Sequence, residues 1–405
     1  MKIKLSGMFL FLGATLAANN FVSGMHAIAY EVDKKQMSMK VIAETAYDPV
    51  KDEGDCVYTL HWNRRTRFQV QKSVPFLSLK PGTPGWIFLS AKDAEKIKKG
   101  ERFTTRRIEI EAQRDGRFGF RSAQKVYAPV YPLKKGRGEI ELGGKRIAFS
   151  APGTVTVFSN GAIEDLRPGV SKMRVYGKVS EKKFLISRAN IIFAADKDNF
   201  DPALPSVLVV GDSISMNYEE ALKKALAGKM NCRRIDGNSG DSNRGSRALP
   251  LWLGDVPGAK SRWSVVVLNH GLHDLKQKSD PATKKFAPRH QVEPKDYAKN
   301  IDRLLKYLTS RNYKVVWCTT TPVPGNSYGA YARRKDEDLV YNKILEPVLK
   351  KYPQVTVCDL NAVVRNSKVF DEWRKGNNVH FGSEAERKLL GDAVAAAIFK
   401  AAGKK

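Results

Sequence analysis

The spacing of apolar residues changes near residue 200. Before that point, short runs alternate apolar and polar side chains, and turn signals such as Asp115-Gly116 and Asn160-Gly161 separate them. Such alternation is typical of half-buried strands. Beyond it, short apolar runs alternate with segments in which apolar residues recur every three or four positions, the spacing of helices. The pattern predicts an all-β region over 30–200 and an α/β region over 201–405.

The first region reads as a series of short strands with one helical turn, at 91–99. The candidate strands are 56–62, 67–71, 86–90, 103–112, 145–149, 154–158 and 184–193. Short strands joined by tight turns favour a sandwich-like fold. The segment 195–205 contains three Asp and two Pro, and we expect it to be the linker to the second region.

The second region predicts a doubly wound sheet of five parallel strands with helices on both faces, as in flavodoxin-like folds. Asn217 and Glu220 have the spacing of a capping box, so we expect the first helix to begin at Asn217. The expected strands are 207–210, 230–236, 263–269, 314–320 and 355–360, and the expected helices are 217–228, 244–253, 297–308, 339–351 and 383–402. In such a sheet the loops that follow the strands share one edge.

Four candidate catalytic residues lie on those loops: Ser213, Gly240, His273 and His380. A serine hydroxyl becomes a useful nucleophile when a neighbouring imidazole accepts its proton. The amides at the start of a helix can also favour developing negative charge. Taken alone, Ser213 could equally be a turn or cap residue.

Four short blocks of this region resemble, in order, those of the SGNH hydrolase family, also called GDSL esterases. They are Gly211-Asp212-Ser213-Ile214, Asn238-Ser239-Gly240-Asp241, Gly271-Leu272-His273-Asp274 and Asn377-Asn378-Val379-His380. The resemblance covers about half of the chain. It implies that Ser213 is the nucleophile and His380 the base. It also implies that the oxyanion is bound by the N–H groups of Ser213 and Gly240 and by the residue at position 273.

Two of the blocks depart from the family pattern. His273 stands where the family has Asn; a neutral imidazole can donate one hydrogen bond, although His270 or Asn269 could serve instead. Asn377 stands where the family has Asp. An amide can hold the imidazole but adds no negative charge. Either His380 works with Ser213 as a dyad, in which Asn377 only holds the ring, or another acid such as Asp371 reaches His380.

The first 29 residues resemble an export signal. Lys2 and Lys4 precede an apolar run at 8–18 that is too short to span a bilayer. Small residues suitable for cleavage occur at Gly24, Ala27 and Ala29. The alternative is a membrane anchor, and no later stretch is apolar enough to span a membrane. The four cysteines have no metal-ligand spacing, and we expect neither a metal nor a cofactor.

The formal net charge is +28, and both regions contribute to the excess of Lys and Arg. A basic surface attracts polyanions, but no concentrated basic arm of the kind that binds nucleic acid is present. We therefore expect as partner an acylated polysaccharide or another small ester, including anionic glycans. Asp241, Arg244 and Tyr328 lie on loops expected to border Ser213, and we assign them to substrate binding.

These features favour an exported serine esterase that hydrolyses O-acyl esters, acetyl esters first among them, on a polysaccharide. The β-rich region would then be an accessory module. Two alternatives stay open: a lipase or thioesterase of the same family, and a weak or inactive relative that only binds glycans. The retained Ser213, Gly240 and His380 favour the enzyme.

Overall fold

The computed structural model describes residues 21–44, 56–105, 107–111, 118–134, 136–180, 183–192, 200–279, 286–324, 331–376 and 378–403. These residues form two compact units. The described residues of the first lie within 21–41 and 58–192, and those of the second within 42–44, 56–57 and 200–403. Within the described residues, no helix is both long and apolar enough to cross a membrane.

The β-rich character predicted for the first region is confirmed. Fourteen strands are described: β1 (Phe21–Asp33), β2 (Ser38–Glu44), β3 (Val57–His61), β4 (Arg67–Pro75), β5 (Thr83–Phe88), β6 (Phe103–Thr104), β7 (Arg107–Ile110), β8 (Gly119–Ser122), β9 (Lys125–Leu133), β10 (Arg137–Leu142), β11 (Lys145–Ser150), β12 (Thr154–Gly161), β13 (Lys172–Ser180) and β14 (Lys183–Ile192). Helix α1 (Ala91–Lys98) occupies the expected helical turn, and Ser90 caps it by accepting the N–H of Asp93.

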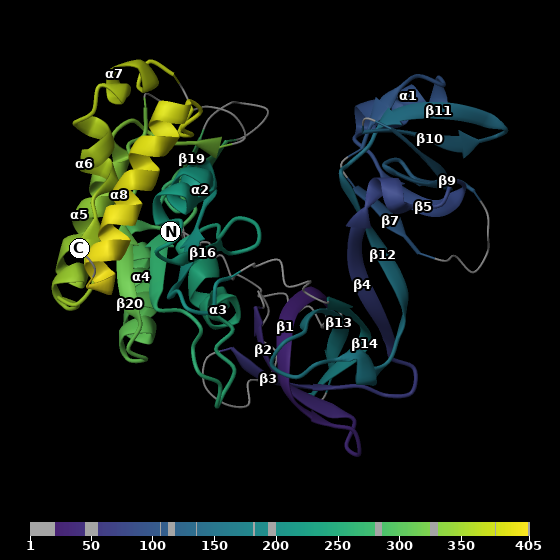
Figure 1. The fold of residues 1–405 in the computed structure, drawn as a ribbon, viewed down its shortest axis with the longest axis horizontal. Helices are drawn as coiled ribbons and strands as arrows, with labels where there is room; N and C mark the ends of the chain where they lie inside the picture. Colours follow the sequence, from purple (N-terminus) through teal and green to yellow (C-terminus); the bar gives the residue numbers. More distant parts are fainter. Residues whose placement is uncertain are drawn as a thin grey trace, which may run out of the picture. The chain divides into compact units, whose positions relative to one another are not determined.

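A sandwich consists of two separate sheets, but these strands do not divide in that way. They form one hydrogen-bonded path, in which β13, β1, β2, β3 and β14 close into a ring because β13 pairs with both β1 and β14. The long strands β4 and β12 pair antiparallel and run from this ring to the group that contains β5, β9, β10 and β11 (Figure 1). Alternation predicts which side of a strand is buried, but it does not predict the partner strand.

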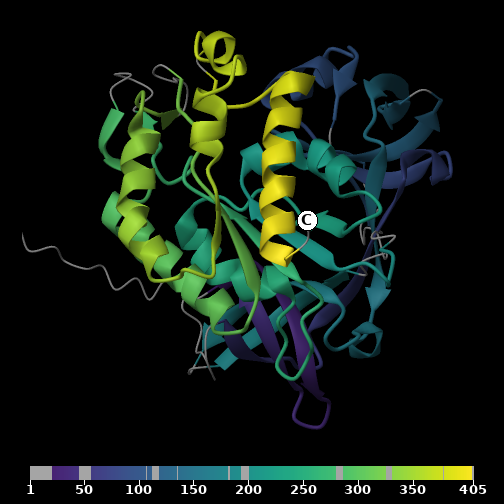
Figure 2. The same ribbon diagram turned by 60° about the vertical axis from the view of Figure 1, so that its left-hand side comes forward.

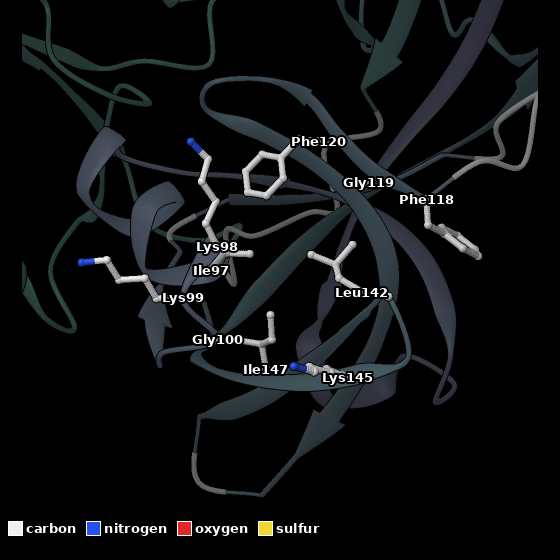
Figure 3. A pocket seen from close by; sticks show the side chains of 11 residues that line it. Ile97, Lys98, Lys99, Gly100, Phe118, Gly119, Phe120, Leu142, Lys145 and Ile147 are labelled. Atoms are coloured by element: carbon white, nitrogen blue, oxygen red, sulfur yellow. The ribbon is translucent and has the colours of Figure 1, made fainter.

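A pocket of about 420 Å³ opens in the group of strands that contains β5, β9, β10 and β11. It lies between the end of α1, β8 and the turn that joins β10 to β11 (Figure 3). Its floor is apolar, and its rim carries lysines and the ring of Phe120, which is 38% exposed. The lining residues are Ile97, Lys98, Lys99, Gly100, Phe118, Gly119, Phe120, Leu142, Gly143, Lys145 and Ile147.

The second unit contains the predicted five-stranded parallel sheet. Its order is β16 (Asn231–Arg234), β15 (Ser206–Gly211), β17 (Val265–Asn269), β20 (Lys314–Cys318) and β22 (Thr356–Cys358). All neighbouring pairs are parallel. The order matches the flavodoxin-like pattern, in which the sequence direction reverses next to the first strand. Every residue of β17 is buried, as expected for a strand covered on both faces.

Helices cover both faces of this sheet. Helix α8 (Glu384–Ala402) packs on β17, β20 and β22 and lies beside α2 (Ser213–Leu226), and Figure 2 shows it in yellow across the sheet. Helix α4 (Pro294–Thr309) packs on β20 between α3 (Ser242–Leu253) and α5 (Glu337–Lys350). Gly391 allows the close approach of α8 to α2, because a Cβ there would lie 2.7 Å from the Cβ of Ala221.

One predicted helix start is wrong. Helix α2 begins at Ser213, not at Asn217, because Asp212 already caps it by accepting the N–H of Ile214 (2.9 Å). Asn217 lies inside the helix, and its Oδ1 accepts the N–H of Phe381 (3.1 Å). The side chain expected to start the helix therefore holds a distant loop.

Some elements of the second unit were not predicted. They are α6 (Leu360–Arg365), α7 (Val369–Trp373) and a three-stranded sheet with the order β19 (Phe286–His290), β18 (Gln277–Ser279) and β21 (Tyr331–Ala332). Within the small sheet, β18 pairs antiparallel with both of its neighbours. The small sheet joins the loops that follow β17 and β20, and it therefore shapes the edge of the large sheet where Ser213 lies.

Candidate active site

Ser213 is the first residue of α2, and only Asp212 separates it from the end of strand β15. The turn between them is tight: a Cβ at Gly211 would lie 2.7 Å from the Cβ of Ser215, so only glycine fits without displacement. The first N–H groups of a helix have no partner inside it. The Ser213 N–H is therefore at the position of a helix start, where it can donate to an anion.

His380 lies within hydrogen-bond distance of Ser213: its Nε2 is 2.8 Å from the serine Oγ. The loop that carries His380 is held on both sides. The Trp373 ring stacks on Phe381 with centroids 4.9 Å apart, and its Nε1–H donates to the His380 carbonyl (3.2 Å). Ser383 and Glu386 form the predicted capping box of α8.

Asn378 orients the His380 ring. Its Oδ1 accepts the His380 backbone N–H (3.1 Å) and lies 2.7 Å from Nδ1. The amide oxygen only accepts, so Nδ1 carries the ring proton and Nε2 is free to accept the Ser213 hydroxyl. This is the tautomer that a general base requires.

Sequence reasoning missed Asn378, because the family motif places the third member three residues before the histidine, at Asn377. Asn377 lies outside the described residues. The residue type of Asn378 could have indicated this role, because Asn side chains commonly accept the N–H of the residue two positions later. Asp371, the alternative acid, is exposed on α7 and pairs with Arg374. Among the described residues, no carboxylate forms a hydrogen bond with the His380 ring.

His273 is oriented by Lys276. The Lys276 Nζ lies 3.3 Å from the His273 Nδ1. An ammonium group only donates, so Nδ1 accepts and the neutral ring carries its proton on Nε2. Burial, with the charges of Lys276 and Arg333, lowers the pKa of His273 to about 4, which keeps the ring neutral at pH 7. The ring can thus donate from Nε2, as its predicted oxyanion role requires.

The two alternatives to His273 are deeply buried. The His270 ring packs against α3, since its Cε1 lies 3.0 Å from where a Cβ of Gly245 would be, and burial lowers its pKa to about 4. Asn269 ends β17 beside Gly211 and is 2% exposed. These positions leave His273 as the more accessible donor of the three.

The Gly240 loop is held by local hydrogen bonds. Gly240 has φ +68°, and its N–H donates to Asn238 Oδ1 (2.8 Å). The same N–H can bind an oxyanion only if this bond is shared or released. Arg244 Nη1 donates to the Asn238 carbonyl (2.6 Å), and Asp241 caps α3 by accepting the Arg244 N–H (2.9 Å). Asp274 ties this loop to the next one by accepting the Ser242 N–H (2.9 Å).

The side chains of Asp241 and Arg244 therefore hold the loop in this structure, and Asp241 also accepts a hydrogen bond from Gln291. Their assignment to substrate binding stays a prediction. Tyr328, the third residue of that assignment, lies outside the described residues. No group of His, Cys, Asp or Glu within the described part of the chain is arranged to hold a metal ion.

Comparison with known proteins gives the same family as the four blocks. Residues 209–388 match the model of the GDSL-like lipase/acylhydrolase family. No curated protein matches the chain.

Among solved structures, the C-terminal catalytic domain of Streptococcus pneumoniae peptidoglycan O-acetyltransferase A is 20% identical. The match covers 50% of this chain and 97% of that one, with a TM-score of 0.33. An acetyl xylan esterase is 16% identical, with coverage of 48% and 99% and a TM-score of 0.36. An esterase of a Pseudoalteromonas species is 13% identical, with coverage of 48% and 97% and a TM-score of 0.34.

The first prediction concerns the pH dependence of the base. His380 accepts a proton only when neutral, and burial together with the positive charge of Arg333 lowers the pKa of His380 below the ordinary value of 6.5. Activity should therefore persist at pH 6.5 and fall only under more acidic conditions. The measurement is kcat/KM for para-nitrophenyl acetate from about pH 4 to about pH 8. An acid limb centred above 6.5 would contradict this environment for His380.

The second prediction concerns the third member of the site. A carboxylate in place of the Asn378 amide would face Nδ1 and stabilise the imidazolium that forms as Ser213 attacks. Asn378→Asp should raise kcat about tenfold, which corresponds to about 1.4 kcal/mol of barrier. It should also move the acid limb upward, since a carboxylate favours the charged ring.

Asn377→Asp is the matched comparison, because it restores the family motif at the neighbouring position. A rise confined to Asn378→Asp assigns the orienting role to residue 378. A rise confined to Asn377→Asp assigns it to residue 377. No rise in either variant, with a large loss in Asp371→Ala, would show that a distant acid serves His380.

Proposed function

Because residues 209–388 form a GDSL-like lipase/acylhydrolase domain, we propose that this protein is an exported serine esterase. It removes O-acyl groups, acetyl groups first among them, from a polysaccharide. The observation that carries the proposal is the contact of Ser213 Oγ with His380 Nε2 at 2.8 Å, with Nδ1 of the same ring held by Asn378.

The arrangement supports a two-step mechanism. Ser213 Oγ attacks the ester carbonyl while His380 Nε2 takes its proton, and Asn378 keeps the ring in place. The negative oxygen of the tetrahedral intermediate is bound by the Ser213 N–H and His273 Nε2–H, with Gly240 N–H as a third donor once it leaves Asn238. His380 then protonates the departing sugar oxygen. Water activated by His380 releases the acyl group from Ser213.

Export is part of the proposal and rests on the N-terminal segment. The described structure starts with β1 at Phe21, and Met25, Ala27 and Ala29 are buried there. Cleavage at the small residues of 24–29 would remove β1 positions that pair with β13. Cleavage at a point before Phe21 would keep these pairs, so we propose that the signal peptide ends before the described part of β1.

The β-rich unit is proposed as a glycan-binding module. An exposed aromatic ring beside an apolar floor suits the face of a sugar ring. Lys99 and Lys145 on the rim of the Figure 3 pocket would favour an acidic sugar over a neutral one. Such a module would hold the domain that carries Ser213 near its polymeric substrate.

The third prediction tests the enzyme against the inactive glycan-binding alternative. A fluorophosphonate probe should label the wild-type protein at Ser213, because the probe reacts with serines activated by a base. Ser213→Ala should lose all labelling and His380→Ala should lose most of it. Rates on esters of increasing acyl length then separate an acetylesterase from a lipase or thioesterase. A folded wild-type protein without Ser213-dependent labelling would favour the binding protein.

The fourth prediction tests the pocket of the β-rich unit. Phe120→Ala should weaken retention on an immobilised acidic polysaccharide about fivefold to tenfold, since loss of a contacting ring costs on the order of 1 kcal/mol. Leu133→Ala is the matched control, because Leu133 is similarly exposed (42%) but lies outside the pocket. Equal effects of the two substitutions would exclude this pocket as the binding site.

A further inference from the structure

The small sheet of the second unit holds Arg333 beside the loop that follows β17 and carries His273. Strand β21 ends at Ala332, which pairs with Gln277 of β18. The following residue, Arg333, turns its side chain to the loop after β17, where Nε donates to the Leu272 carbonyl at 2.8 Å. Leu272 directly precedes His273. The side chain is half-buried and is anchored through Nε.

The hydrogen bond to Leu272 places the Arg333 guanidinium beside the loop that carries His273. Burial and the charge of Arg333 lower the pKa of His380, and burial with the charges of Lys276 and Arg333 lowers the pKa of His273. Burial raises the pKa of Asp212, the cap that precedes Ser213, to about 6, and the charge of Arg333 opposes this rise. These effects agree with a guanidinium close to the loops that carry His273 and His380. Arg333 is hydrogen-bonded to the residue directly before His273, which is the candidate oxyanion donor.

Within the described residues, no carboxylate forms an ion pair with Arg333, and its two terminal nitrogens have no hydrogen-bond partner there. The carboxylate that its charge affects, Asp212, already caps α2. A half-buried cation without a counter-ion is unfavourable. A ligand that supplies the missing negative charge would offset this cost. The planar fork of a guanidinium fits a carboxylate, with two parallel N–H···O bonds.

We propose that the two terminal nitrogens of Arg333 bind a carboxylate of the substrate next to Ser213, so that the preferred substrate is an O-acylated acidic sugar. This inference rests on the proposed esterase function and names its substrate class. Lys276 is less suited to the role, because its Nζ already contacts His273. Arg333 is here a specificity residue, and the acyl transfer itself is carried by Ser213 and His380.

The test uses one polymer in two charge states: acetylated polygalacturonic acid, and the same polymer after methyl esterification of its carboxyl groups. Wild-type protein should release acetate from the acidic form with a kcat/KM at least about tenfold higher, since charge-assisted bidentate pairs are strong. Arg333→Gln should reduce this preference to about twofold or less, mainly through KM, because the lost contact binds the ground state as well.

Arg334→Gln is the matched control. It removes the same charge from the neighbouring exposed residue, so its acidic preference should stay close to that of the wild type. Arg333→Lys, which keeps the charge but loses the fork, should retain an intermediate preference. Equal losses on both polymers in Arg333→Gln would overturn the proposal in favour of a structural or oxyanion role. An equal fall in preference for Arg334→Gln would overturn it in favour of general surface charge.

A binding measurement separates this inference from the proposed function. Free galacturonate and galactose are titrated into Ser213→Ala protein, with and without Arg333→Gln. Galacturonate binding that depends on Arg333, and weaker galactose binding, supports the subsite even if no ester is hydrolysed. Absence of Arg333-dependent galacturonate binding would overturn it even if the esterase activity is established.

Discussion

Burial of the parallel sheet on both faces is the constraint on which the second unit depends. Strand β15 lies between β16 and β17 and is covered by helices, so its residues can contribute only to the core. Polar chemistry is then confined to the ends of the strands. Because all five strands run in one direction, the loops after them meet at one edge, and segments separated by more than a hundred residues come together there. The contact of Ser213 with His380 is a consequence of that geometry.

Short polar side chains that bind the backbone hold this edge in shape. Asp212 and Asp241 cap helices at the ends of two loops, and Asn378 accepts the N–H of His380 in the same manner. Each of these bonds satisfies a backbone donor that would otherwise lack a partner. They also orient the reacting groups. In Asn378 the two functions coincide, since one amide oxygen binds both the backbone N–H and the ring Nδ1 of His380.

The electrostatics of the site are set by cations and by neutral imidazoles. Arg333 and Lys276 lie close to His273, and their charges and burial keep that ring neutral. A neutral ring bound by an ammonium group at Nδ1 can only donate from Nε2. An imidazole can thereby take the place of the amide that the family uses, and the positive surroundings favour an oxyanion. The same surroundings would repel a cationic substrate and attract an acidic one.

By itself, the sequence predicted the five-stranded parallel sheet of the second unit and the helices that cover it, because the signals for these elements are local. Apolar runs of β-branched residues predict buried strands, and the four blocks place Ser213, Gly240, His273 and His380 after them. The pairing of distant segments needed the tertiary structure. Strand β9 was missed because Pro129 and Pro132 weaken its pattern, yet it pairs with both β5 and β10. The helix start at Ser213 and the roles of Asn378, Lys276 and Arg333 also depend on contacts across loops. Only the folded chain decides such contacts, because each forms between groups whose spacing along the sequence does not specify their distance in space.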